Sequence, residues 1–218
     1  MPHVCVLISG CGFLDGAEIH ESVISLLFLS QAGATYEVTA PHKKQMHVVN
    51  HHTGEVCAGE ERMVHEEAAR IARGAVLDLS DVDVSKFDAL MIPGGFGAAK
   101  NLCDFAIQGA GATIDPDAAA LISSFHQAQK PIGAVCIAPA VLALALKKGN
   151  LTIGDDAGTA EQLSKLGASH QNCAVTEVCI DADNKIATAP AYMYGNAQIA
   201  EVAEGIQKTI SALLSMCS

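Results

Sequence analysis

The sequence predicts an α/β fold: one doubly wound, mostly parallel sheet with helices packed on both of its faces. Short apolar runs rich in Val, Ile and Ala alternate along the chain with longer amphipathic segments, and this alternation is typical of a parallel sheet covered by helices. Most of the amphipathic segments stop at a glycine, where helices commonly end. The length of 218 residues suits one core and is short for two. Residues 1–218 are therefore expected to form a single domain.

The expected strands are short apolar runs, and most of them contain β-branched residues. In chain order they are residues 4–9, 36–40, 89–92, 132–135, 178–180 and 186–189. The expected helices are the longer segments between them, and four of the first five end just before Gly33, Gly74, Gly149 or Gly167. In chain order they are residues 19–32, 63–72, 118–129, 138–148, 159–166 and 197–214.

The net charge and composition of the chain argue against several classes of binding partner. The formal net charge is −11 and no basic run exceeds a pair, which argues against nucleic acid or an anionic membrane as a partner. The longest apolar stretch, residues 132–146, is too short to span a bilayer and contains Gly133 and Pro139. The N-terminus leads into a strand without a basic leader. Eight cysteines without a C-x-x-C pair indicate reduced thiols. A cytoplasmic protein is expected.

Cys136 is the most informative residue of the chain. It directly follows the apolar run 132–135 and precedes the helix-like run 137–146. A side chain on such a sharp strand-to-helix turn points out of the sheet at the N-terminus of the next helix, as in a nucleophile elbow. The helix dipole is expected to lower the pKa of this thiol below its free value. The alternative is a buried, inert cysteine, the usual state of a free thiol in a core.

The loop at residues 93–101 follows an expected strand and contains Gly94 and Gly95. Their backbone N–H groups, together with that of Ile137, are candidates for stabilising an oxyanion beside Cys136. The alternative is that the two glycines only make a tight turn. Neither of the common phosphate-binding glycine motifs is present in this loop.

The loop at residues 9–19 supplies the candidate acid. Asp15 and Glu18 have the spacing of a capping box, which explains Glu18 structurally. Glu21 has no such explanation and lies one turn further along the expected helix, from which it can point to the carboxyl edge of the sheet. A carboxylic acid there could hold the proton that thiol chemistry needs. The alternative is a solvated glutamate near a helix N-terminus.

Several motifs together resemble a known family. They span nearly the whole chain and comprise residues 9–12, 15–16, 18–21, 50–51, 93–102, 136–139, 151–154 and 188–192. The chain is similar to the class I glutamine amidotransferase-like superfamily, which has a flavodoxin-like fold and contains the Parkinson-associated deglycase and intracellular proteases. Within it, the resemblance is close to the isoprenoid biosynthesis branch, also called the enhancing lycopene biosynthesis family.

The resemblance implies roles for particular residues. It places the nucleophile on Cys136 and the functional glutamate on Glu21 rather than Glu18. It places the backbone donors on Gly94 or Gly95 and on Ile137. Glu18, His51 and Asn101 also fall in matching segments, and they are expected to lie near the pocket.

The same resemblance implies an activity, and one departure narrows it. Amidotransferases that release ammonia carry His-x-Glu after the cysteine, and this chain has His170 there without the Glu. A glutaminase is therefore not expected. The resemblance implies a cofactor-free glyoxalase that converts glyoxal or related 2-oxoaldehydes to 2-hydroxy acids, with deglycation as a related activity. The alternative is a redox-sensing protein whose Cys136 is oxidised, because both functions need the same residues. Close relatives form dimers, so a homodimer is expected.

A metal site is not expected. His42, His47, His51, His52 and Cys57 crowd one segment, but their spacings do not match the usual paired-ligand patterns.

Overall fold

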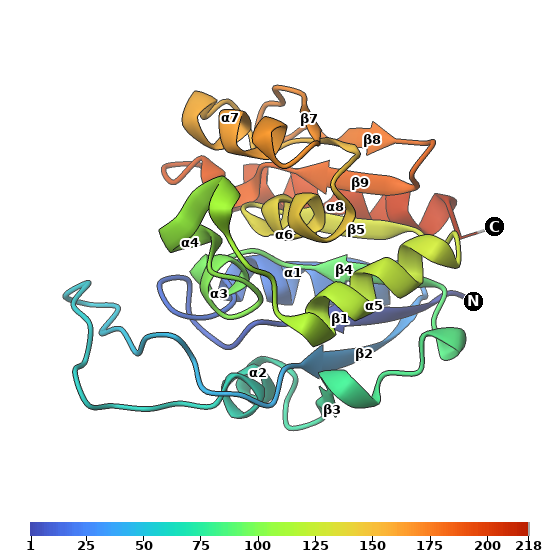
Figure 1. Ribbon diagram of the computed structural model, residues 1–218. Coiled ribbons are helices and arrows are strands. Elements are labelled where there is room, and N and C mark those ends of the chain that lie inside the picture. Colours follow the sequence, from blue (N-terminus) through green and yellow to red (C-terminus); the bar gives the residue numbers. More distant parts are fainter. Residues whose placement is uncertain (218) are drawn as a thin grey trace.

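The computed structural model describes residues 1–217. Its centre is a seven-stranded sheet with the strand order β3-β2-β1-β4-β5-β9-β8 (Figure 1). Neighbouring strands are parallel except for β8 and β9, which are antiparallel. The strands are β1 (His3–Leu7), β2 (Thr35–Ala40), β3 (Leu77–Asp78), β4 (Ala89–Ile92), β5 (Ile132–Val135), β8 (Cys179–Asp181) and β9 (Ile186–Ala189). Two further short strands, β6 (Asn150–Leu151) and β7 (Ser169–His170), form a separate parallel pair.

Helices cover both faces of the sheet. They are α1 (Ile19–Gln31), α2 (Val64–Ile71), α3 (Phe96–Lys100), α4 (Phe105–Gln108), α5 (Pro116–Gln127), α6 (Ala138–Leu146), α7 (Ala157–Lys165) and α8 (Ile199–Ser215). In Figure 1, α5 and α6 lie in front of the sheet, and α1 and α8 lie behind it. Short 3-10 turns occupy Leu79–Asp81, Val84–Lys86, Gly109–Gly111 and Ala191–Met193.

The alternation of side chains along β1 shows how the two layers form. Val4 and Val6 belong to the apolar cluster that includes residues of α1, α2 and α8. Cys5 and Leu7 belong to the second cluster, with residues of α3, α5 and α6. Successive side chains of a strand point to opposite faces, so a strand buried on both faces must be apolar at every position. This is why β1 and β4 are continuous apolar runs rather than alternating ones.

The strand order predicts a crevice at the carboxyl ends of the central strands. The chain leaves β1 through α1 to reach β2 on one side, and it later returns to β4 on the other side of β1. Loops that leave neighbouring strands toward opposite faces open a crevice at the carboxyl ends of those strands. The loop after β1, the loop after β4 and the turn after β5 therefore meet at this edge.

The predicted fold class is confirmed: the strands predicted over 89–92, 132–135 and 186–189 have the predicted bounds, and the other three strands and the six helices are found with shifted ends. The helix predicted over 118–129 begins at Pro116, because Asp115 caps it and proline fits its first turn. The glycine-rich loop at 93–101 contains the five-residue helix α3, which was not predicted. The helix α4 and the two-residue strands β3, β6 and β7 are too short to leave a periodic pattern.

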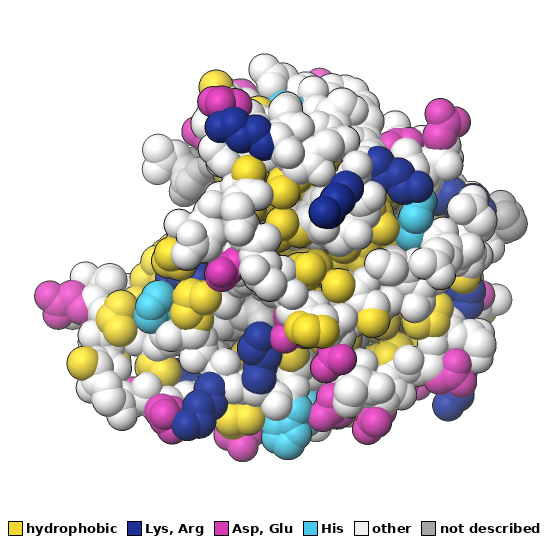
Figure 2. All heavy atoms as spheres, viewed as in Figure 1, with side chains coloured by type: hydrophobic (Ala, Val, Ile, Leu, Met, Phe, Trp, Pro, Cys, Tyr) yellow, Lys and Arg dark blue, Asp and Glu magenta, His cyan; other side chains and the backbone are white. Residues whose placement is uncertain are grey.

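The distribution of charged side chains on the surface agrees with the absence of long basic runs in the sequence. On the face seen in Figure 2, Lys and Arg side chains are scattered among acidic ones rather than gathered in one patch. Within residues 1–217, no helix combines the length and the apolar character needed to cross a membrane.

Candidate active site

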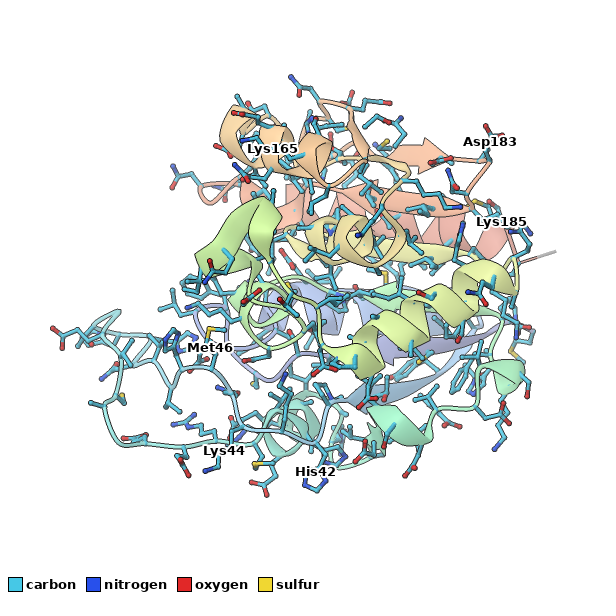
Figure 3. All side chains as sticks on the ribbon, in the orientation of Figure 1. His42, Lys44, Met46, Lys165, Asp183 and Lys185 are labelled. Carbon is cyan, nitrogen blue, oxygen red and sulfur yellow. The ribbon has the colours of Figure 1, made fainter. Side chains whose placement is uncertain are left out.

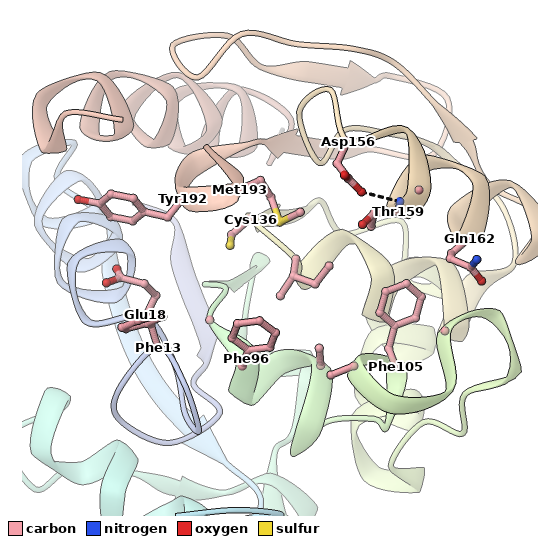
Figure 4. Close-up of a pocket in the computed structure, with 16 residues that line it drawn as sticks. Phe13, Glu18, Phe96, Phe105, Cys136, Asp156, Thr159, Gln162, Tyr192 and Met193 are labelled. Atoms are coloured by element: carbon pink, nitrogen blue, oxygen red, sulfur yellow. Dashed lines mark hydrogen bonds between the residues drawn. The ribbon is translucent and has the colours of Figure 1, made fainter. Parts of the chain in front are cut away.

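Cys136 lies on a strained turn between β5 and α6. Its φ of 59° is in the left-handed region, which non-glycine residues rarely adopt. The Cys136 N–H donates to the Ala189 carbonyl at 3.0 Å, which fixes the turn to β9. The N–H groups of Gly95 and Ile137 act to lower the pKa of this thiol. The side chain is 7% exposed and forms part of the wall of a pocket (Figure 4). The residue thus sits on a nucleophile elbow at the N-terminus of α6.

Gly94 allows the loop after β4 to touch this turn. A Cβ atom at this position would lie 2.4 Å from Cys136 Cβ and 2.7 Å from Glu21 Oε2, so any side chain would collide with both. The Gly94 N–H donates to Glu21 Oε2 at 2.9 Å, and the Gly94 carbonyl accepts from the Glu18 N–H at 3.0 Å. Of the two glycines expected to offer a free donor, only Gly95 acts to lower the pKa of the Cys136 thiol. The expectation for Gly94 is corrected, because its N–H is used by Glu21.

Glu21 is brought against Cys136 from the first turn of α1. Its side chain is fully buried, Oε2 accepts from the Gly94 N–H, and Oε1 accepts from the Tyr192 N–H at 3.1 Å. Its carboxyl group lies beside the Cys136 side chain, since both flank the same position at Gly94. Burial and then the nearby charge of Glu18 raise the pKa of Glu21 from 4.5 to about 8, although the hydrogen bonds oppose the shift. The carboxyl group is therefore mostly protonated at neutral pH.

The expected low pKa of Cys136 is not found. Burial, followed by the charge of Glu21, raises the pKa of the thiol well above its usual value of 9.0. The N–H groups of Gly95 and Ile137 act in the opposite direction but do not outweigh these two effects. The reason is that the helix N-terminus supplies partial charges, whereas the loss of water around an ion in a buried site is a larger penalty.

Glu18 caps α1 in a way the spacing did not predict. It is itself the N-cap residue, and its Oε2 accepts from the Glu21 N–H at 2.7 Å. Asp15 is not part of a capping box, because the helix starts at Ile19, three residues too late for Asp15 to reach it. Asp15 is buried and accepts instead from the Val49 N–H at 2.7 Å. Glu18 also lines the pocket, as expected.

Asn101 and His51 support the loops behind the pocket rather than lining it. The Asn101 amide donates to the carbonyls of Ser9 and Asp15 at 2.9 and 2.8 Å, and its oxygen accepts from the Met46 N–H at 3.0 Å. His51 accepts from the Leu14 N–H at 3.2 Å, and its ring packs edge-on against Phe13, with centroids 5.5 Å apart. The expectation that these two side chains reach the pocket is corrected. Both side chains instead form hydrogen bonds that join one loop to another.

The pocket itself has a volume of about 710 Å³ and opens beside Cys136. Its walls come from the loop after β1, from α3, α4 and α7, and from the turn after β9. The residues are Phe13, Glu18, Gly95, Phe96, Ala99, Phe105, Ala106, Gly109, Cys136, Ile137, Asp156, Gly158, Thr159, Gln162, Tyr192 and Met193. Within the described chain, the lining includes no histidine, lysine or arginine.

Most of the aromatic and polar lining residues were not predicted. Phe105, Asp156 and Gln162 lie on segments whose approach to Cys136 depends on how α4 and α7 pack. One signal was present: Asp156 and Thr159 have the spacing of a helix N-cap, and the Asp156 carboxylate does accept from the Thr159 N–H at 2.7 Å. That signal locates the start of α7 but not the pocket beside it.

The histidine-rich segment does not form a metal centre in the structure. Within residues 1–217, no group of three or more His, Cys, Asp and Glu side chains is arranged to hold a metal ion. Figure 3 shows the segment running past His42, Lys44 and Met46 between β2 and α2. His42 lies 3.5 Å from an Asp78 oxygen, while His51 faces Phe13 and the loop after β1.

Comparison with known proteins shows a family match. Residues 12–195 match the model of the DJ-1/PfpI family. A human protein named "Glutamine amidotransferase-like class 1 domain-containing protein 3, mitochondrial" is 43% identical over 199 residues, which cover 87% of this chain and 74% of that protein. The rat "ES1 protein homolog, mitochondrial" is 40% identical over 222 residues, covering 98% of this chain and 83% of that protein.

A solved structure matches over the full length. It is the isoprenoid biosynthesis protein with amidotransferase-like domain from Ehrlichia chaffeensis, with a TM-score of 0.94, 38% identity and 100% coverage of both chains. This similarity agrees with the family resemblance read from the motifs.

Proposed function

The chain belongs to the DJ-1/PfpI family, and from this premise we propose that it is a cofactor-free glyoxalase that acts through Cys136 and Glu21. The observation that carries the proposal is that a fully buried carboxyl group lies beside the side chain on the strained turn: the Gly94 N–H donates to Glu21 Oε2, and a Cβ atom at Gly94 would lie 2.7 Å from that oxygen and 2.4 Å from Cys136 Cβ. The pKa of Glu21 is raised to about 8, close to the pH at which a general acid and base works best in a cell.

The first step joins the substrate to the protein. The Cys136 sulfur attacks the aldehyde carbon of a 2-oxoaldehyde, the carbon–sulfur bond forms, and the carbonyl electrons move to oxygen. Glu21 gives its proton to this oxygen and takes the proton of the thiol, so the product is a neutral hemithioacetal. The N–H groups of Gly95 and Ile137 favour negative charge on the sulfur and can donate to the oxygen as its charge develops. Because a proton is passed at each stage, a thiol with a raised pKa is compatible with this step.

The second step moves hydrogen between neighbouring carbons. Glu21 first releases to water the proton that it took from the thiol; as a carboxylate it then removes the proton from the former aldehyde carbon, and the electron pair forms an enediolate with the adjacent carbonyl. Return of the proton to the adjacent carbon gives a thioester and an alcohol. One carbon is oxidised and its neighbour is reduced, so no external oxidant is needed. Water then hydrolyses the thioester, releases the 2-hydroxy acid and restores the thiol.

Glutamine hydrolysis is less well supported by the same site. Release of ammonia from an amide needs an acid for a poor nitrogen leaving group, usually a histidine. The sequence has no His-x-Glu after Cys136. An aldehyde has no leaving group in the first step, so this absence matters less for it. Deglycation of early aldehyde adducts uses the same addition to a carbonyl and is proposed as a related activity.

A redox-sensing role is the second candidate. The protonated Glu21 and the two N–H groups could hold the oxygen atoms of an oxidised Cys136. The raised pKa of the thiol weighs against this role, because the thiolate is the form that oxidants attack.

Turnover of glyoxal by the purified protein, compared with that of Cys136→Ser, separates the two functions. The purified protein should convert glyoxal to glycolate, and Cys136→Ser should lose this activity. Absence of glycolate with the unmodified protein at neutral pH would overturn the glyoxalase proposal.

We also propose how the chain assembles and where in the cell it is located. We propose a homodimer in the cytoplasm, without nucleic acid or membrane partners. Ile19, Val23 and Leu27 form an apolar stripe on α1 and are 43%, 48% and 48% exposed, a surface that a second copy could cover.

A further inference from the structure

The size of the pocket differs from the size of the smallest substrates. The volume of about 710 Å³ lies in the range of sites that hold drug-sized ligands, roughly 300–1,000 Å³. Glyoxal, with two carbons, would occupy only a small part of it. A small substrate would leave most of the pocket filled with water. The pocket walls could not then orient that substrate, because they would not touch it.

Part of the pocket wall is aromatic. Phe13 and Phe96 remain 47% and 45% exposed, and they line the pocket together with Phe105 and Met193. In Figure 4, the Phe96 and Phe105 rings lie between the Cys136 side and the Gln162 side of the pocket. Exposed rings lose contact with water when an apolar body covers them, and offset or edge-on ring packing adds to this gain. The chemistry of these walls fits an aromatic or comparably bulky apolar group.

The charge of the lining is negative. Glu18 and Asp156 are its charged residues, and the described lining contains no lysine or arginine. Hydrogen bonds from the Thr159 side chain and N–H lower the pKa of Asp156, so this carboxylate is ionised at neutral pH. Lys100 lies over the Phe96 ring at 5.0 Å, but its ammonium group donates to the Leu14 carbonyl at 2.9 Å and it does not line the pocket. An anionic group would meet repulsion without a compensating cation.

We infer that the pocket takes an apolar, ring-sized group without negative charge next to Cys136, which makes aryl and bulky alkyl 2-oxoaldehydes its preferred substrates. This inference names the substrate class and rests on the proposed function. The reactive aldehyde is bound at Cys136, and the body of the substrate lies against Phe96 and Phe105. The product is a 2-hydroxy acid, whose new carboxylate is repelled by Glu18 and Asp156, so the same charges favour its release.

The first test measures the apolar contact. The value of kcat/KM for phenylglyoxal should exceed that for glyoxal by at least tenfold, after subtraction of the rate with Cys136→Ser. Phe96→Ala should lower the ratio of the two values about tenfold, the scale expected for losing part of a hydrophobic contact. Ile180→Ala is the matched control: Ile180 is 50% exposed on β8 and does not line the pocket. Equal kcat/KM values for both aldehydes would overturn the size argument while leaving the glyoxalase proposal intact.

The second test measures the charge. A phenylglyoxal with a carboxylate on the ring has the same body and an added negative charge, so its kcat/KM should be at least tenfold lower. Asp156→Asn should reduce this discrimination, and asparagine can still cap α7. Asp155→Asn is the control, since Asp155 is exposed and outside the lining. Equal rates for the charged and neutral aldehydes, or an equal effect of both variants, would overturn the charge argument.

A third measurement keeps the two proposals apart if no aldehyde is converted. In that case the glyoxalase proposal fails, and the pocket is tested by ligand protection. Phenylacetamide should slow the alkylation of Cys136 by iodoacetamide, whereas acetamide and phenylacetate at the same concentration should not. Equal protection by all three compounds, or by none, would overturn the inference about the pocket.

Discussion

Two opposing influences act on the sulfur atom of Cys136. The N–H groups of Gly95 and Ile137 favour the thiolate, while burial and the Glu21 carboxylate favour the thiol, and the second pair is stronger. Glu21 is itself held in its protonated form by burial and by Glu18. At neutral pH most of the resting pair is therefore uncharged. A thiol held in this form should react slowly with alkylating agents and oxidants, because these reagents attack the thiolate.

The proton of Glu21 can be tested by replacing it. Glu21→Gln keeps the shape but removes the titratable proton, so turnover of glyoxal should fall about a hundredfold or more, the usual scale of general acid–base catalysis. Glu18→Gln is the matched control, because its side chain can still accept from the Glu21 N–H. It should cost on the order of 1 kcal/mol or less in stability and retain most activity. If only Glu18→Gln lost activity, the functional acid would be Glu18, and its assignment to Glu21 would be wrong.

The raised pKa of Glu21 also predicts how stability depends on pH. The folded protein keeps this proton up to about pH 8, whereas the unfolded chain releases it near 4.5. The folded state binds more protons in this window, so the free energy of unfolding should fall as pH rises from 4.5 to 8, by an amount on the order of a few kcal/mol. Glu21→Gln should remove this part of the pH dependence.

Urea unfolding at several pH values between 4.5 and 8 measures the effect. The variant should also carry a pH-independent loss, since one of the N–H groups of Gly94 and Tyr192 would face an amide nitrogen instead of an oxygen. Only the slope with pH therefore bears on the pKa. Parallel curves for the two proteins would show that Glu21 titrates near its ordinary value in the folded state.

Among the elements, the loop after β4 brings the site together. It touches the turn after β5 through Gly94 and the start of α1 through the hydrogen bond between the Gly94 carbonyl and the Glu18 N–H. Gly95 continues this contact with a φ of 87°, and a Cβ there would lie 2.4 Å from the Glu18 nitrogen. Both glycines are therefore required by close approach of three backbone segments. The tight-turn interpretation and the functional one do not exclude each other.

Gly94→Ala tests this contact. The added Cβ would collide with Cys136 Cβ and Glu21 Oε2, and relief of such overpacking should cost roughly 1–3 kcal/mol or more in stability. Turnover should fall further than stability explains, because the thiol and the carboxyl group would be pushed apart. Gly195→Ala is the control, as nothing lies within 4 Å of a Cβ at that position. Wild-type activity in Gly94→Ala, measured well below its Tm, would contradict the packing described here.

At the scale of the whole molecule, the apolar stripe on α1 predicts assembly. Val23→Glu together with Leu27→Glu should convert a homodimer to a monomer, because two buried charges would face each other across the interface. Light scattering at micromolar concentration measures the mass. Ile180→Glu on the edge strand β8 is the control and should remain a dimer. A monomeric unmodified protein would contradict the homodimer, and a dimer that survives both changes on α1 would place the interface elsewhere.

The sequence by itself determined the architecture and the position of Cys136 on the turn between β5 and α6. Apolar alternation and glycine stops located the main strands and helices, because these signals are local and repeat over each element. Cys136 could be identified for the same reason, since strand, turn and helix are adjacent in the chain. Glu21 was separated from Glu18 by the register of the family motif. Single short elements such as α3 were missed, because five residues carry too little pattern.

Only the tertiary structure decided the protonation of the site and the shape of the pocket. The N–H that binds Glu21 Oε1 comes from Tyr192, 171 residues away, and desolvation depends on every segment packed around a group. The wrong pKa direction predicted for Cys136 came from this cause, because helix dipoles can be read locally and burial cannot. In the same way, Phe13, Phe105 and Asp156 meet in one pocket because α4 packs against α3, and both α4 and α7 pack against the turn Gly109–Gly111. Spacing along the chain carries no record of that contact.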